Sequence, residues 1–122
     1  MQHIEIMAPV GSYESLSAAI KAGADSVYFG ITQLNMRARS SNNFYLTDLL
    51  KIASICKENS VKSYLTLNTL LYDHDLELMR KIVTRAKEAG VSAIIATDMA
   101  AIGFCKEVGM NVHISTQMSI SN

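Results

Sequence analysis

The feature that most constrains this sequence is a regular alternation of short apolar runs with single helical stretches. The runs expected to form strands cover residues 4–8, 26–29, 61–68, 92–96 and 111–115. The stretches expected to form helices cover residues 12–22, 47–59, 75–89 and 98–108. A strand, one helix and a second strand make a parallel βαβ unit, so the alternation predicts an α/β protein with a parallel sheet.

Each predicted helix has one apolar face that can pack against the sheet, and it is flanked by residues that can begin or end a helix. Apolar residues such as Leu76, Met79 and Val83 recur at helical spacing. Residues suited to begin a helix stand at Ser12, Thr47 and Asp98, and residues suited to end one stand at Gly23, Gly90 and Gly109.

The polarity of the strands favours a barrel over an open sheet. A doubly wound sheet has helices on both faces, and its strands are apolar throughout. Here each strand alternates instead. One face carries Ile4, Ile6, Leu65, Leu67, Val112 and Ile114, and the other carries Glu5, Tyr28, Thr66, Asn68, His113 and Ser115. We therefore expect all four helices to pack on the apolar face, and the polar face to line a barrel lumen.

The length predicts part of a barrel. A complete (β/α)8 barrel takes about 250 residues, whereas this chain has 122 and no helix after its fifth strand. The expected fold is the N-terminal half of a TIM-type barrel, with about five parallel strands and four helices. Residues 1–122 would form one partial domain.

The composition excludes several classes of protein. Eleven basic residues balance eleven acidic ones, which argues against nucleic-acid binding by bulk charge. No apolar run approaches the length of a membrane helix, and the N-terminus does not resemble a signal peptide. Cys56 and Cys105 do not form a disulfide framework, and they fall on helices, where small buried hydrophobes are expected. These features predict a cytoplasmic protein without membrane contact.

Four blocks of residues, in order, resemble proteins of peptidase family U32. The first is APVGS at 8–12 leading to AGADSVYFG at 22–30. It is followed by MRAR at 36–39 with Asn43 and Phe44, TLNTL at 66–70, and HISTQMS at 113–119. The resemblance covers nearly the whole chain and implies a barrel fold.

The resemblance also implies an activity for the complete protein. Some family members are described as collagenase-like proteases, and others resemble oxygen-independent hydroxylases of a tRNA base, an rRNA base or a quinone precursor. For the hydroxylases it implies prephenate as oxygen donor and an iron–sulfur cluster whose cysteines lie beyond residue 122. We expect the complete protein to hydroxylate an RNA base. Peptidase activity is the alternative, and a non-catalytic binding module remains open for this chain alone.

No protease machinery is evident within the chain. His113 and Ser115 share a strand face, but residues two apart lie about 7 Å apart along a strand, whereas a nucleophile and its base need about 3 Å. The three histidines, His3, His74 and His113, show no metal-ligand spacing. We expect no metal site and no cofactor within these residues.

The candidate site residues come from strand ends and from one long loop. Glu5 is a weak catalytic candidate, because a carboxylate in an apolar strand needs a partner or has a raised pKa. Arg37 and Arg39 follow the second strand in a βα loop of about 16 residues, where their planar guanidinium groups suit a carboxylate or phosphate. The other predicted substrate-binding residues are Asn68, Asp98, His113, Ser115 and Gln117.

A half barrel leaves two strand edges unpaired. We therefore expect the 122-residue chain to self-associate and to be inactive alone. For the complete protein, the expected partner is RNA or a small anionic substrate.

Overall fold

A parallel sheet forms the centre of the fold. The computed structural model describes residues 5–32, 44–67 and 75–114. Within them one sheet contains five strands: β1 (Met7–Pro9), β2 (Ser26–Phe29), β5 (Lys62–Thr66), β6 (Ala93–Ala96) and β7 (Val112–Ile114). Each strand pairs in parallel with the next one along the chain. This sequential order is that of a barrel wall, because a doubly wound sheet reverses its order at a switch point.

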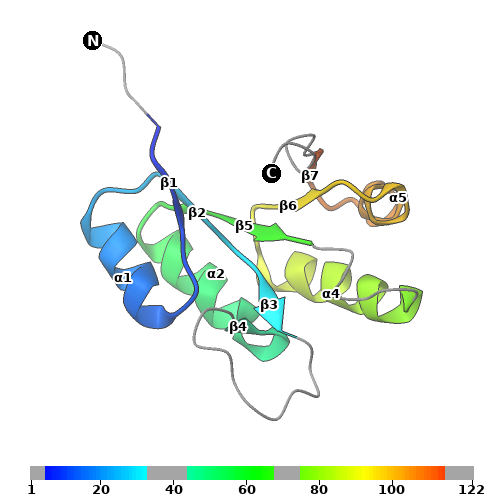
Figure 1. The fold of residues 1–122 in the computed structure, drawn as a ribbon, viewed down its shortest axis with the longest axis horizontal. Helices are drawn as coiled ribbons and strands as arrows, with labels where there is room; N and C mark the ends of the chain where they lie inside the picture. Colours follow the sequence, from blue (N-terminus) through cyan, green and yellow to red (C-terminus); the bar gives the residue numbers. More distant parts are fainter. Residues whose placement is uncertain (1–4, 33–43, 68–74, 115–122) are drawn as a thin grey trace, which may run out of the picture.

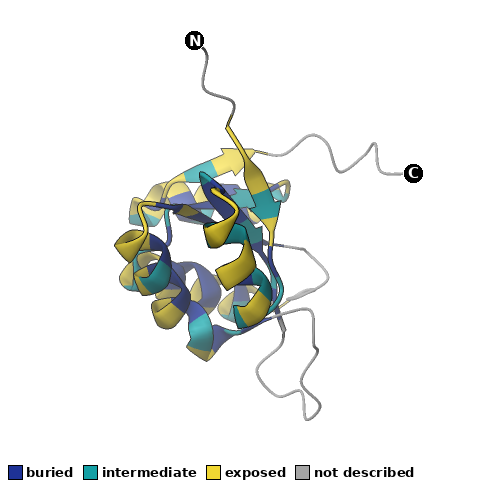
Figure 2. Cartoon of the chain, turned by 90° about the vertical axis from the view of Figure 1, so that its left-hand side faces the viewer, coloured by how far each residue is buried: buried dark blue, intermediate teal, exposed yellow. Residues whose placement is uncertain are grey.

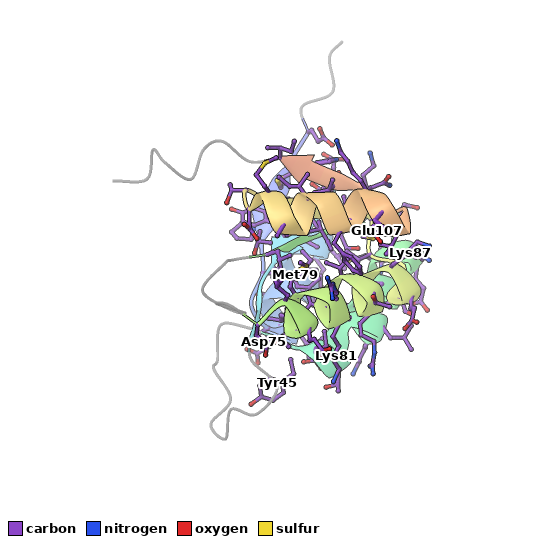
Figure 3. The ribbon with its side chains drawn as sticks, turned by 90° about the vertical axis from the view of Figure 1, so that its right-hand side faces the viewer. Tyr45, Asp75, Met79, Lys81, Lys87 and Glu107 are labelled. Carbon is purple, nitrogen blue, oxygen red and sulfur yellow. The ribbon has the colours of Figure 1, made fainter. Side chains whose placement is uncertain are left out.

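Helices connect successive strands. They are α1 (Tyr13–Lys21), α2 (Leu49–Glu58), α4 (Leu76–Ala89) and α5 (Met99–Val108), and they follow one another along one side of the sheet (Figure 1). Figure 3 shows Lys87 and Glu107 at the same end of α4 and α5, with Asp75 and Tyr45 at the opposite end. Helices α4 and α5 therefore run in the same direction, as successive βα units require. No helix in the described residues is long and apolar enough to cross a membrane.

The hydrophobic core lies between the helices and one face of the sheet. The sheet contributes Val27, Phe29, Leu65, Ile94 and Ala96 to it, and the strand register with its two-residue alternation places these five on the same face. Leu67, directly after β5, is also part of this core. Figure 2 shows the buried residues gathered inside the layer that the helices cover. The prediction of helices on one face only is confirmed, and with it the choice of a barrel wall over a doubly wound sheet.

The first strand and the second helix begin later than predicted. Strand β1 starts at Met7 rather than at residue 4, and Ile6 is 48% exposed. A short 3-10 helix, Leu46–Asp48, precedes α2, so the N-cap residue of α2 is Asp48 and not Thr47. The predicted cap at Ser12 is confirmed, because its side-chain oxygen accepts a hydrogen bond from the Ser15 N–H (3.1 Å).

Two very short strands lie outside the sequence prediction. Strands β3 (Ile31–Thr32) and β4 (Phe44–Tyr45) pair in parallel at the two ends of the predicted long loop. Two residues are too few to show any periodicity, so a pattern of apolar residues cannot reveal them.

Two glycines on and after α5 should respond oppositely to alanine. Gly103 is exposed within the helix, and an added Cβ would meet no atom within 4 Å. Gly103→Ala should therefore stabilise the fold by about 1 kcal/mol, since glycine is a poor helix former. Gly109 ends the same helix with φ of 78°, so Gly109→Ala should destabilise it by about 1–2 kcal/mol. Urea unfolding of both variants measures the difference, and shifts of the same sign would contradict it.

Candidate functional site at the open face of the sheet

The face of the sheet that carries no helices presents side chains in rows across the strands. The pairing register places Pro9, Tyr28, Tyr64 and Ala93 in one row. One step nearer the C-terminal ends of the strands, a second row contains Thr66, Ile95 and His113. In a barrel this face lines the interior, and its C-terminal end forms the active site. We call these seven residues the open-face rows.

A ring contact joins the two rows. The Tyr64 and His113 rings lie with their centroids 5.3 Å apart and their planes inclined by 42°. Tyr64 belongs to β5 and His113 to β7, so the two side chains meet across β6, which lies between them. The β6 residue in register with Tyr64 is Ala93, which is only 2% exposed. A larger side chain at this position would occupy the space in which the rings meet.

The polar groups of the open-face rows also tie neighbouring strands together. The Thr66 hydroxyl donates a hydrogen bond to the Phe29 carbonyl oxygen (3.1 Å). This bond links β5 to β2 at their C-terminal ends, and it leaves the lone pairs of the hydroxyl oxygen available to an incoming donor.

The described residues on either side of segment 33–43 make specific contacts with neighbouring elements. Phe44 is buried and makes edge-to-face ring contacts with Tyr13 (5.2 Å) and Phe29 (5.7 Å). The Asp48 carboxylate accepts hydrogen bonds from the Tyr13 hydroxyl (2.7 Å) and from the Tyr45 N–H (2.8 Å). Together with the β3–β4 pairing, these contacts connect the described residues on either side of the segment to α1.

The structure describes three of the residues predicted to form the site. Glu5 is exposed and precedes β1, so the expectation of a carboxylate inside an apolar strand is wrong. Asp98 follows β6 and begins α5, where its carbonyl oxygen accepts a hydrogen bond from the Ile102 N–H (3.0 Å). His113 lies on the open face, the face to which the sequence pattern assigns it, and is exposed there. Five predicted residues lie outside the described residues: Arg37, Arg39, Asn68, Ser115 and Gln117.

The sequence prediction missed two residues with specific contacts. Tyr64 lies within the predicted strand 61–68 but not in the predicted site, and its partner His113 is 49 positions later. Asp48 was read as part of a helix, although its carboxylate connects Tyr13 and Tyr45. The alternation of polarity along the third strand was the available signal for Tyr64.

The two cysteines do not fit an iron–sulfur cluster. Cys56 and Cys105 are buried in the core on α2 and α5, which are separated by α4. Burial raises the pKa of the Cys56 thiol to about 11 and also raises the pKa of the Cys105 thiol. Cluster ligands are thiolates, and a raised pKa favours the protonated thiol. Among the described residues, no three His, Cys, Asp or Glu side chains are grouped to hold a metal ion.

A parallel sheet in sequential strand order, with helices on one face only, defines an α/β protein of the barrel class. The fold resembles the solved structure of a U32 peptidase with a TM-score of 0.64 over 93% of this chain and 48% of that one, at 9% sequence identity. Peptidase family U32 matches residues 11–122, and the chain belongs to that family.

Relatives of the chain carry names from two classes of activity. A collagenase of Porphyromonas gingivalis is 65% identical over 97% of this chain and 28% of its own length. The tRNA hydroxylation protein P1 of Bacillus subtilis is 31% identical over 97% of this chain and 28% of its own length. A 23S rRNA 5-hydroxycytidine synthase of Escherichia coli is 31% identical over 96% of this chain and 18% of its own length. The chain thus spans less than a third of each of these relatives.

Proposed function

We propose that the whole protein to which this chain belongs hydroxylates a base of tRNA or rRNA. The observation that carries the proposal is the character of the open-face rows, where aromatic rings and a hydroxyl group stand side by side. Flat rings stack on nucleobases, and hydroxyl groups donate or accept the hydrogen bonds that base edges offer. The names of the Bacillus subtilis and Escherichia coli relatives support this class of reaction.

The proposal includes an oxygen donor and a redox centre from outside the described site. Converting a C–H bond to C–OH without molecular oxygen requires a donor of the oxygen atom and an acceptor for two electrons. We propose prephenate, a dicarboxylate, as the oxygen donor, and an electron acceptor that takes the two electrons through the redox centre. Arg37 and Arg39 would bind its carboxylates, since paired guanidinium groups suit such anions. We propose that cysteines outside these 122 residues hold an iron–sulfur cluster. A protein with this substrate would act in the cytoplasm.

Peptidase activity is the second candidate, and the 65% identity to the Porphyromonas gingivalis collagenase favours it. A peptidase needs either a nucleophile in hydrogen-bonding reach of a base or a metal-bound water. Such groups would have to come from outside the open-face rows, because these seven residues include one histidine and no carboxylate or thiol.

The two candidates are separated by assays on the full-length protein. Total RNA from cells that lack the gene should lose one hydroxylated nucleoside, detected by mass spectrometry as the loss of one oxygen atom. Expression of the full-length gene should restore it. Purified protein should leave gelatin intact under conditions in which a control protease digests it. Gelatin cleavage together with an unchanged nucleoside profile would establish the peptidase and reject the hydroxylase.

A further inference from the structure

We propose that Tyr64 and His113 form a stacking surface for the base that the protein modifies, with His113 in contact with the base and Tyr64 as a positioning residue. The inference rests on the proposed function and names the residues that would bind its substrate. It starts from the ring contact across β6, which brings together two side chains from strands that are not neighbours.

The two rings differ in exposure in the way that such a surface requires. Tyr64 is only 7% exposed, whereas His113 is an exposed residue. The buried ring cannot offer a full face to a ligand, but it limits the rotation of its exposed neighbour. A side chain held in place before binding loses less conformational entropy when the ligand arrives.

The location of the pair favours a planar ligand. His113 lies in the row nearer the C-terminal ends of the strands, on the face without helices. Its neighbour in that row is Ile95 of β6, an apolar side chain beside which a flat ring can lie. An exposed imidazole ring next to an apolar side chain suits the π-face of a nucleobase, because base–aromatic stacking needs area and tolerates any base.

The charge around the pair also favours a neutral ring as the ligand. The open-face rows contain no Lys, Arg, Asp or Glu side chain. Lys62, on the same face of β5, lies one row nearer the N-terminal ends of the strands, on the far side of Tyr64 from His113. A phosphate group would therefore find no cation in these rows, and we place the phosphates of the RNA outside them. A base, which is neutral, matches the described surface.

The test measures stacking directly in the full-length protein. The probe is a short single-stranded RNA that carries 2-aminopurine, whose fluorescence falls when it stacks on an aromatic ring. Wild-type protein should bind the probe and quench it. His113→Leu should weaken binding at least about fivefold, the smaller end of what one lost base stack costs, and should abolish the quenching. His113→Phe, which keeps a ring, should bind within about twofold of wild type and still quench.

Substitution of Tyr64 tests the positioning role. Tyr64→Leu should weaken binding and quenching by removing the ring that orients His113, while Tyr64→Phe should leave both unchanged. Leu50→Val, at an exposed position of α2 away from the open face, serves as the control and should resemble wild type. Thermal unfolding of each variant shows whether the fold is intact. If the Tyr64→Leu protein fails to fold, the comparison of His113→Leu with His113→Phe still tests whether the base stacks on this surface.

The outcomes separate this proposal from the proposed function. Wild-type protein that binds the probe, with His113→Leu binding and quenching equally well, would overturn the stacking surface and leave RNA hydroxylation intact. Wild-type protein that binds a gelatin peptide and not the RNA would overturn both. Equal losses in His113→Leu and His113→Phe would also reject stacking, because a ring alone would then be insufficient.

Discussion

The isolated 122-residue chain is expected to sediment as a dimer or a larger species at micromolar concentration. Strands β1 and β7 are the two ends of the described sheet, and an edge strand has backbone N–H and C=O groups open to pairing with another chain. The same strands and their borders expose large apolar side chains: Ile6 and Met7 are each 48% exposed, and Ile114 is 59% exposed. Figure 2 shows this exposure along both edge strands.

The expected driving force is large enough for association. Burial of about 400 Å² of apolar surface is worth roughly 10 kcal/mol before the costs of association. The simplest closed arrangement is a pair of chains about a two-fold axis. The relatives are more than three times longer than this chain, so most of their residues have no counterpart in it. We therefore expect the isolated chain to show neither turnover nor bound iron.

Charged substitutions at the edges should prevent the association. Ile6→Lys combined with Ile114→Lys should give a monomer, since lysine on an edge strand opposes pairing. Leu50→Lys is the matched control, because Leu50 is 64% exposed on α2, away from both edges. Sedimentation velocity separates the species. A monomeric parent chain, or equal dissociation by Leu50→Lys, would show that the edges do not drive the association.

Replacement of both Arg37 and Arg39 with alanine in the full-length protein should weaken prephenate binding at least about tenfold. A hydrogen bond to a charged group contributes about 1.5–3 kcal/mol. The loss of one such bond is therefore enough to weaken prephenate binding about tenfold. Both arginines lie outside the described residues. Among the described residues that follow them, Phe44 and Asp48 both contact Tyr13 of α1.

The matched control removes the same number of arginines from another surface. Arg80 and Arg85 are exposed on α4, and their replacement with alanine should leave prephenate affinity unchanged. Isothermal titration calorimetry measures both variants against wild type. Unchanged affinity in the Arg37 and Arg39 variant would remove these residues from the binding site, and equal losses in both variants would indicate a general effect of charge.

The order of elements and the side of the sheet that the helices cover were determined by the sequence alone. Helical spacing along α4 and the alternation of polarity in β5 are local patterns, because side-chain direction repeats every 3.6 residues in a helix and every two in a strand. The predicted cap at Ser12 is equally local, since its side chain accepts a hydrogen bond from the backbone N–H three residues later. Such features need no knowledge of the rest of the chain.

Contacts between distant residues were decided only by the tertiary structure. The Tyr64–His113 ring contact depends on the register of three strands, and the Tyr13–Asp48 hydrogen bond on how α1 packs beside the start of α2. Glu5 is exposed because the first strand pairs only from Met7 onward. Register and pairing follow from the packing of the whole core, and a one-residue shift reverses the face of every side chain in a strand. No local pattern carries that information, so the candidate site became visible only once the strands were placed side by side.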